Sequence, residues 1–384
     1  MNQELQPFFE VLNGSNSVDD AYLQAPGSGS VPKLPDYEDI VARYPDLANA
    51  KCVFVSGSLV SGWGNERSDL DIFVIANEGH VRDVIPDSVV KVGRTDQDIE
   101  QAGFVVAMGS VGGVRADIEF WTAEYIDGLI SQTRPRSERY LGRKGHPTYE
   151  EQDLLYRLSI GRALSGHDWL TERKRQIQES DYPIWIAENH KVHGENQLED
   201  LVGMYASNDI KSATLMARDS YTSALQAILA FQGDVSPSGK WIAHRLAQAK
   251  LGHPSIEEAW AVLTMRDCTE PDWPMATARR AHRIFLTVEQ EISGHSRCGT
   301  TESHHGIERR LGVRTYRIEG DTIIADVTKC RTNAVGGYIW SLCDGIHAEA
   351  DIARCLARDF GLNSADAAEY VTSALSDLRA KGLI

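Results

Sequence analysis

The stretch that decides the fold is FVSGSLVSGWGNERSDLDIFVI, residues 54–75. It predicts a strand, a glycine turn, a short helix and a second strand that opens with two carboxylates. The run 72–75 is apolar and rich in β-branched and aromatic residues, as expected for a strand buried on both faces. Asp69 and Asp71 stand at its mouth, and positions two apart on a strand share a face at a spacing of about 6.6 Å. The two carboxylates therefore point the same way and favour a cation between them.

A glycine-serine turn precedes these acids, where backbone N–H groups can approach a phosphate. Alone, a D-x-D motif is more commonly the solvated start of a surface strand. Together, the turn, the spacing and RSDLD at 67–71 resemble the signature of polymerase-β-type nucleotidyltransferases. The resemblance implies that Asp69 and Asp71 hold two Mg²⁺ ions and that a nucleoside triphosphate, which we expect to be ATP, is the co-substrate. It assigns nucleotide contacts to Gly57, Ser58, Arg67 and Ser68.

The same family has a third carboxylate on a later strand, and VRADIEFW at 114–121 supplies candidates. Gly112 and Gly113 are expected to make a hairpin turn into this strand. The alternation of the strand places Arg115, Asp117 and Glu119 on one face. Asp117 matches the resemblance better because apolar residues flank it, and it is expected to bind metal and activate the acceptor. Glu119 is the alternative, and its simpler interpretation is an exposed ion pair with a cation such as Arg115, which contributes little stability.

Composition bounds the class of protein and its partners. The 384 residues exceed one ordinary core, which predicts two or three domains. Lys and Arg number 39 against 55 Asp and Glu, and the net charge of −16 disfavours a long nucleic acid and favours a small-molecule or peptide acceptor. Scattered cysteines, no signal peptide and no membrane-length apolar run predict a reduced cytoplasmic protein without membrane contact. The sequence leaves the oligomeric state open.

Residues 150–293 predict a helical bundle. Its helices are expected at 151–165, 183–205, 209–231, 239–251, 255–264 and 274–293, and Asp209 is the expected N-cap of the third. Such a bundle beside this catalytic unit resembles the small-molecule nucleotidyltransferases, including aminoglycoside-modifying ones. SPSGKW at 236–241 is a turn into a helix, and its Lys240 is similar to a recurrent lysine of these enzymes that meets the nucleotide phosphates. The alternative for Lys240 is a solvated lysine beside a core tryptophan.

Two other segments have open interpretations. Residues 131–146 carry five cations and one acid, and either face a triphosphate or form a solvated loop. Residues 294–306 contain histidines and a cysteine that suit zinc as ligand types, but their spacing matches no common site, so a polar connector is preferred.

The C-terminal segment 313–384 predicts two strands, at 315–318 and 322–327, followed by three helices, and Ser364 is the expected N-cap of the last helix. NAVGGYIWSLCDG at 333–345 and the closing LRAKGLI resemble the PqqD family. The resemblance implies a winged helix-turn-helix that binds the leader of a ribosomally made precursor peptide as an added strand. The candidate peptide contacts are Ile324, Val327, Val371 and Leu375. A DNA-binding winged helix is disfavoured because the segment has 8 basic and 10 acidic residues. A dimerisation wing is a third interpretation.

The predicted fold class is α+β. A polymerase-β-type mixed sheet with helices precedes an all-α helical bundle and a winged helix-turn-helix. The predicted divisions are an N-terminal segment and linker at 1–34, the catalytic domain at 35–149, the bundle at 150–293, a linker at 294–312 and the PqqD-like domain at 313–384.

The first functional hypothesis is metal-dependent transfer of a nucleotide to a precursor peptide. The second is a small-molecule nucleotidyltransferase whose wing serves assembly. The third is a non-catalytic scaffold that binds nucleotide and peptide, which the cost of keeping unpaired acids at a buried strand mouth disfavours.

Overall fold

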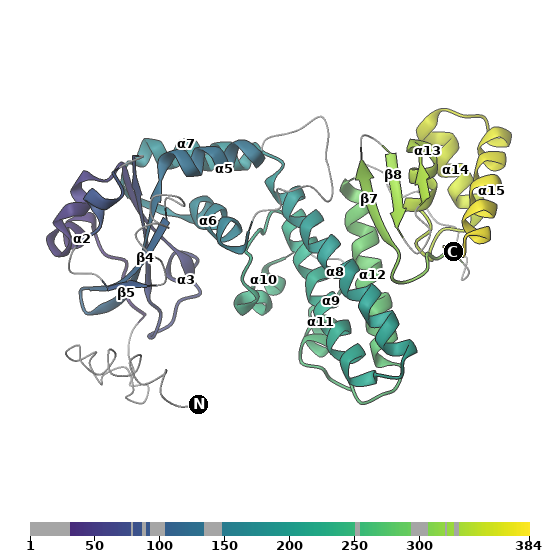
Figure 1. Ribbon diagram of the computed structural model, residues 1–384, viewed down its shortest axis with the longest axis horizontal. Helices are drawn as coiled ribbons and strands as arrows, with labels where there is room; N and C mark the ends of the chain where they lie inside the picture. The colour runs from purple at the N-terminus through teal and green to yellow at the C-terminus, as the bar shows by residue number, and fades with distance from the viewer. Residues whose placement is uncertain are drawn as a thin grey trace, which may run out of the picture. The chain divides into compact units, whose positions relative to one another are not determined.

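The computed structural model describes residues 31–77, 80–86, 90–92, 104–133, 148–249, 254–292, 306–318, 321–325 and 330–384. Its internal contacts divide the chain into two compact units, whose elements are labelled in Figure 1. Unit 1 comprises residues up to 123 together with 160–167. Unit 2 comprises 124–159 and 168–384.

Unit 1 is built on a six-stranded mixed sheet with the order β3-β4-β5-β2-β1-β6. The strands are β1 (Cys52–Ser56), β2 (Leu70–Ala76), β3 (Val90–Val92), β4 (Phe104–Val111), β5 (Val114–Thr122) and β6 (Arg162–Ser165). β2 and β5 are parallel, and the other neighbouring pairs are antiparallel. The predicted strand-turn-strand stretch thus forms the middle of the sheet, with β2 between β1 and β5.

One face of this sheet carries the main core of unit 1. Alternate residues of β2, such as Ile72 and Val74, pack there with Ile40 of helix α2 (Tyr37–Arg43) and with Tyr44, which lies between α2 and the 3₁₀ turn η2 (Pro45–Asn49). On the other face, Phe54 and Phe73 stack with their ring centroids 4.9 Å apart. β2 is therefore buried on both faces, as its apolar run predicts.

The turns of unit 1 follow from their glycines. Gly112 and Gly113 have φ angles of 58° and 80° and close the hairpin between β4 and β5, as predicted. Short elements complete the unit: α3 (Gly57–Val60) follows β1, and η3 (Arg82–Val84) follows β2.

The predicted helix 151–165 is wrong at its end. Helix α6 stops at Ile160, and Arg162–Ser165 form β6, which pairs with the outer edge of β1. The Oγ atom of Ser165 accepts the backbone N–H of Val53 at 3.1 Å, which fixes this edge strand. The chain therefore returns to unit 1 after α6, a step that helical periodicity does not reveal.

The part of unit 2 that ends at residue 292, here called the helical region, consists of helices. They are α5 (Ala123–Thr133), α6 (Tyr149–Ile160), α7 (His167–Gln178), α8 (Tyr182–Ala206), α9 (Ile210–Phe231), α10 (Ile242–Gln248) after η4 (Gly239–Trp241), α11 (Ile256–Leu263) and α12 (Trp273–Ile292). α9 packs against both α8 and α12 (Figure 1). Its predicted N-cap is confirmed, since the Asp209 side chain accepts the N–H of Ser212 at 3.2 Å.

The C-terminal part of unit 2 is a three-stranded antiparallel sheet followed by three helices. Its elements are β7 (Arg314–Ile318), β8 (Asp321–Ala325), β9 (Cys330–Thr332), α13 (Ala334–Ser341), α14 (Glu349–Phe360) and α15 (Ser364–Ala380). The third strand is not predicted, because three residues are too few to show an alternation. Asn363, rather than the expected Ser364, caps the last helix by accepting two backbone N–H groups.

Several sequence-based predictions lie outside the described residues. They concern the five cations between 134 and 144, the histidines and cysteine of the connector before residue 306, and Val327. Among the described residues, no helix combines the length and the apolar character that crossing a membrane requires.

Candidate functional site

Two carboxylates lie side by side in the middle of the unit 1 sheet. β2 and β5 are parallel neighbours, and their register pairs Asp71 with Asp117. On the other side of β2, Ser56 at the end of β1 pairs with Asp71. Because residues in register on adjacent strands share a face, Ser56, Asp71 and Asp117 form one polar row across three strands. The register thus brings together two of the acids that the sequence pattern singled out.

A guanidinium group connects the third of these acids to the row. Asp69 immediately precedes β2, and the Nη2 atom of Arg115 contacts its Oδ2 atom. The same Nη2 atom lies 3.4 Å from Oδ2 of Asp117. The side chains of Asp69, Asp117 and Arg115 are 29%, 34% and 47% exposed, so the cluster is open to solvent on one side.

Glu119, the alternative third carboxylate, has different neighbours. It lies two residues beyond Asp117 on β5 and is in register with Phe73 rather than with an acid. Its Oε2 atom accepts the indole N–H of Trp121 at 3.0 Å. The geometry therefore favours Asp117 as the partner of the Asp69 and Asp71 pair.

The predicted phosphate turn lies between β1 and β2. Gly57 has a φ of 80°, in the left-handed region that favours glycine. The Oγ atoms of Ser58 and Ser68 are 3.5 Å apart, and Ser68 Oγ also accepts the N–H of Asn65 at 2.9 Å. Two of the predicted nucleotide contacts, Ser58 and Ser68, are thus adjacent. Arg67 lies next to them in the exposed loop that precedes Asp69.

Lys240, the remaining predicted nucleotide contact, belongs to unit 2. It lies in η4, where the Oγ atom of Ser238 accepts its backbone N–H at 3.3 Å. Its Nζ atom is 5.0 Å from the centroid of the Trp241 ring, a cation–π contact. The lysine is exposed, and its role at a nucleotide stays a prediction.

The acidic row was tested as a Mg²⁺ site. Carboxylate oxygens are the ligands that Mg²⁺ prefers, and the donor set already holds one positive charge, the guanidinium between Asp69 and Asp117. In the positions seen, no three acidic, histidine or cysteine side chains of the described residues converge as metal ligands. The carboxylates therefore suit Mg²⁺ as ligand types. In this structure, however, Asp69 and Asp117 are paired with Arg115.

The C-terminal sheet and helices enclose their own core. Three of the predicted peptide contacts, Ile324, Val371 and Leu375, are 1%, 0% and 0% exposed and lie inside this core. They do not face a peptide at the surface, which corrects the sequence-based assignment. The apolar periodicity that singled them out marks burial rather than binding.

The C-terminal domain is docked on the helical region through buried charges. Arg309, which precedes β7, makes two hydrogen bonds to Glu289 of α12 at 3.1 and 3.2 Å. Its Nε atom donates to the carbonyl oxygen of Trp340 at 2.8 Å, and its guanidinium lies over the Trp340 ring. Lys191 of α8 reaches the same carboxylate at 3.5 Å and Glu195 at 2.7 Å. Burial of all four charged groups requires such mutual pairing.

The ionisation of this cluster follows from its burial. Burial by itself lowers the pKa of Lys191, but the carboxylates of Glu195 and Glu289 reverse the effect and raise it, so Lys191 is charged. Beside them, burial lowers the pKa of His282 to about 3, and the positive charges of Arg309 and Lys191 act in the same direction. His282 is therefore neutral at pH 7.

Two further contacts fix the C-terminal domain. Gln290 of α12 donates to the carbonyl oxygen of Ser341 and to Oδ2 of Asp344, at 3.0 and 2.9 Å. On β7, Arg314 pairs with Glu199 of α8 at 2.9 Å and with Asn196 at 3.1 Å. The first helix and first strand of the domain therefore rest on α12 and α8.

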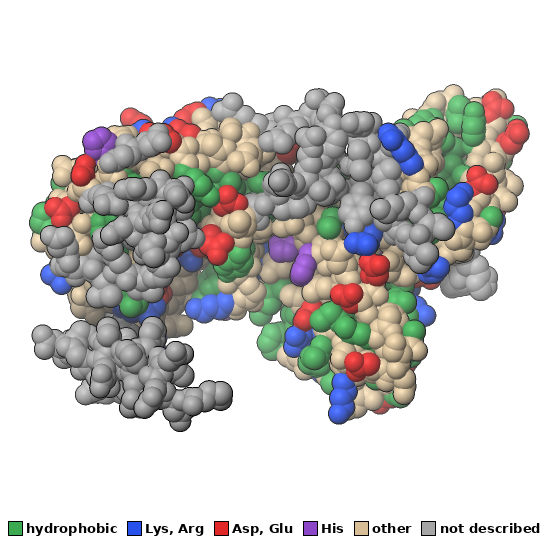
Figure 2. All heavy atoms as spheres, viewed as in Figure 1, with side chains coloured by type: hydrophobic (Ala, Val, Ile, Leu, Met, Phe, Trp, Pro, Cys, Tyr) green, Lys and Arg blue, Asp and Glu red, His purple; other side chains and the backbone are tan. Residues whose placement is uncertain are grey.

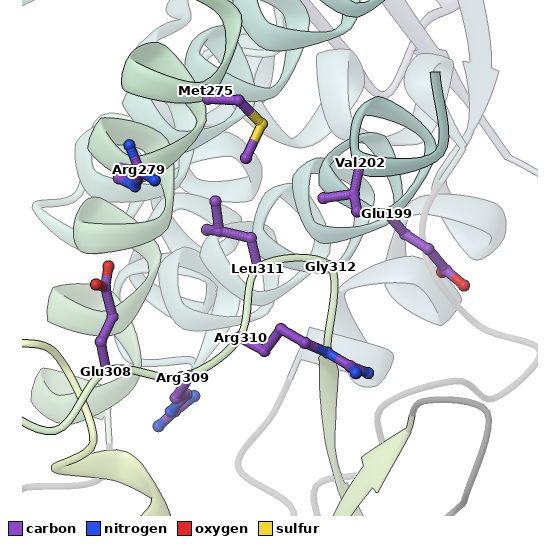
Figure 3. Close-up of a pocket in the computed structure, with 9 residues that line it drawn as sticks. All are labelled: Glu199, Val202, Met275, Arg279, Glu308, Arg309, Arg310, Leu311 and Gly312. Carbon is purple, nitrogen blue, oxygen red and sulfur yellow. The ribbon is translucent and has the colours of Figure 1, made fainter. Parts of the chain in front are cut away.

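A pocket of about 470 Å³ lies beside this docking contact. Figure 3 shows Val202, Met275 and Leu311 toward its middle, with Arg279 and Glu308 at one side. The floor is therefore apolar and the rim carries both signs of charge. On the face drawn in Figure 2, the described Lys and Arg side chains are likewise scattered among Asp and Glu.

Comparisons with known proteins define the C-terminal domain most clearly. Residues 321–384 match the family model described as Coenzyme PQQ synthesis protein D (PqqD), so this segment is a PqqD domain. Among curated proteins, none matches the chain. A crystal structure of a nucleotidyltransferase-like protein from Exiguobacterium sibiricum 255-15 is similar over 69% of this chain and 81% of its own, at 10% identity and a TM-score of 0.31. That likeness is too weak to assign residues.

Sequence reasoning missed two groups of contacts described above. The contact of Arg115 with Asp69 had a signal, because the alternation of β5 places Arg115 and Asp117 on one face. The cluster of Lys191, Glu289 and Arg309 had none, since its members are distant in sequence and each is typical of a solvated residue.

Proposed function

We propose that this chain is a metal-dependent nucleotidyltransferase that moves AMP from ATP to a ribosomally made precursor peptide, in the biosynthesis of a peptide natural product. The observation that carries the proposal is the register of Asp71 with Asp117, next to an Asp69 that shares a cation with Asp117. Carboxylates on adjacent strands beside a glycine turn suit phosphoryl chemistry. The PqqD domain supports a peptide as the acceptor.

In the proposed mechanism, Asp69, Asp71 and Asp117 hold Mg²⁺, which when bound neutralises the triphosphate and polarises the α-phosphorus for in-line attack. Asp117, in register with Asp71, takes the proton of the attacking acceptor group. The bond between the acceptor atom and the α-phosphorus forms, the bond from that phosphorus to the bridging oxygen breaks, and pyrophosphate leaves.

The turn after β1 positions the leaving group in this proposal. The φ of 80° at Gly57 supports a role in which backbone N–H groups of this turn would bind the β- and γ-phosphates, with the Ser58 hydroxyl as a further donor. The contact between Ser58 and Ser68 ties this turn to the loop that carries Asp69. The turn proposed to bind the phosphates and the loop that carries Asp69 are therefore held next to each other.

The peptide is proposed to add as a strand to a domain of the winged-helix type. Of the two outer strands of its sheet, β7 rests on α8 through Arg314, whereas β9 has no neighbour on its outer side among the described strands. β9 is thus the proposed edge for strand addition. Hydrogen exchange tests this: a bound leader peptide should slow the amides of 330–332 and leave those of 314–318 unchanged. Protection of β7 instead would refute the assignment.

The transfer reaction is tested with purified full-length protein, Mg²⁺, ATP labelled at the α-phosphate and a panel of candidate precursor peptides. The proposal predicts labelled peptide and pyrophosphate from the wild type. Asp69→Asn should reduce the rate by at least about a hundredfold, as expected for loss of a group that stabilises the transition state. Full turnover by this variant would refute the catalytic assignment.

The docking contacts favour one alternative, a small-molecule nucleotidyltransferase whose PqqD domain stabilises the helical region. Excision of 313–384 does not separate the two functions, because it also removes Trp340 and Asp344, the hydrogen-bond partners of the buried Arg309 and Gln290. A panel of hydroxylated small molecules in the same assay does separate them. Labelling of a small molecule and none of the peptide would favour the alternative.

A further inference from the structure

The residue that closes the acidic row is a cation supplied by the chain itself. Nη2 of Arg115 contacts a carboxylate oxygen of Asp69 and lies 3.4 Å from a carboxylate oxygen of Asp117. Arg115 and Asp117 are two residues apart on β5, so their side chains share the face on which Asp71 also lies. A guanidinium therefore stands between two of the three carboxylates proposed to hold Mg²⁺.

This guanidinium is able to leave without disturbing the core. The Arg115 side chain is 47% exposed. It lies one residue from the start of β5, next to the hairpin turn at Gly112 and Gly113. Its movement thus requires rotation about the bonds of a half-exposed side chain at the start of a strand.

Electrostatics determine when it should leave. With the three acids alone, the guanidinium is the favoured counter-ion; once a divalent ion binds the same oxygens, two cations compete for them and repel each other. A nucleoside triphosphate changes this balance, because its phosphate oxygens offer the planar fork of arginine a partner of matching geometry. The metal alone only replaces the guanidinium at the carboxylates. Metal and nucleotide together also give the guanidinium a new partner, the triphosphate.

We infer that Arg115 is a positioning residue that occupies the cation site when no nucleotide is bound and moves to the triphosphate when the metal and nucleotide arrive. This inference rests on the proposed function. It means that the site takes up divalent metal weakly by itself and strongly with nucleotide. Arg115 thereby couples the loading of the metal to the presence of the nucleotide substrate.

The test measures Mn²⁺ binding to the full chain from the electron paramagnetic resonance signal of free Mn²⁺, with and without a non-hydrolysable nucleoside triphosphate. Arg115→Gln should bind Mn²⁺ alone roughly tenfold more tightly than the wild type, the effect of losing one competing hydrogen bond to a charged group. The same variant should gain less affinity from nucleotide than the wild type gains. Arg43→Gln is the matched control, since Arg43 is an exposed arginine on α2, against the opposite face of the sheet.

The outcomes separate this inference from the proposed function. If Asp69→Asn weakens Mn²⁺ binding while wild type and Arg115→Gln bind Mn²⁺ alike, the metal site stands and the role of Arg115 is refuted. If the wild type binds no Mn²⁺ even with nucleotide, the proposed function fails and this inference with it. Tighter binding in Arg115→Gln together with unchanged binding in Arg43→Gln supports the role assigned to Arg115.

Discussion

Replacing Arg309 by methionine should detach the PqqD domain from the helical region. In the wild type its side chain is 2% exposed and makes two hydrogen bonds to Glu289 and one to the carbonyl oxygen of Trp340. Arg309→Met removes two hydrogen bonds from the buried Glu289 carboxylate, which keeps the Lys191 contact at 3.5 Å. Breaking a buried ion pair by removing one partner costs about 3 to 5 kcal/mol.

The assay is hydrogen exchange of the α13 amides, residues 334–341. In the regime where exchange reports the opening equilibrium, a loss of 3 to 5 kcal/mol corresponds to exchange faster by roughly one hundred to several thousand fold. Arg358→Met is the control, because its pair with Asp359 is exposed and such pairs contribute at most about 1 kcal/mol.

A double variant sharpens the same prediction. Arg309→Met with Glu289→Met replaces the pair by apolar side chains, and such replacements are often neutral. It should therefore recover much of the protection lost in Arg309→Met. Exchange of α13 that stays within about threefold of the wild type in the single variant would refute the view that this pair holds the domain in place.

Three further predictions concern the acids, the phosphate turn and a buried histidine. Asp117→Asn should reduce nucleotide transfer by at least about a hundredfold, while Glu119→Gln stays within about tenfold, measured with labelled ATP; the reverse order would exchange their assigned roles. Gly57→Ala should cost about 1 to 2 kcal/mol because of the φ of 80°, whereas Gly128→Ala inside α5, where a Cβ meets no atom, should stabilise; equal thermal midpoints would contradict this. Because the pKa of His282 is lowered to about 3, the unfolded chain binds the extra proton and wild-type stability falls as pH drops from about 6.5 toward 3, by about 1.4 kcal/mol per unit. His282→Gln should remove roughly 2 kcal/mol of the loss between pH 7 and 5, and an identical pH profile would show that the fold does not lower the pKa of this histidine.

The sequence predicts those parts of the fold whose signals are local. The strand 72–75, the hairpin at Gly112 and Gly113 and the cap at Asp209 each depend on a few neighbouring residues, and the structure confirms them. The sequence analysis missed β6 and helix α7 because neither has a clear local signal. Arg162–Ser165 form a strand only because β1 offers an edge, and α7 is polar over most of its length.

The candidate site shows the same division. The acids at 69, 71 and 117 come from a motif, and the register of β2 with β5 places two of them side by side. The interpretation of Ile324 and Val371 as peptide contacts failed because apolar periodicity identifies the buried face of an element and not the ligand-facing one. Contacts between residues far apart in the chain, such as Arg309 with Glu289, need the fold.

The most direct measurement of the central claim is the thermal midpoint of the full chain with Mg²⁺ and non-hydrolysable ATP, for the wild type and for Asp69→Asn. A ligand at about 100 times its dissociation constant adds roughly 2.7 kcal/mol, which raises the midpoint by several degrees. The proposed function predicts a rise that requires Mg²⁺ and is lost in Asp69→Asn. A wild-type midpoint unmoved by any nucleoside triphosphate would contradict a working nucleotide site.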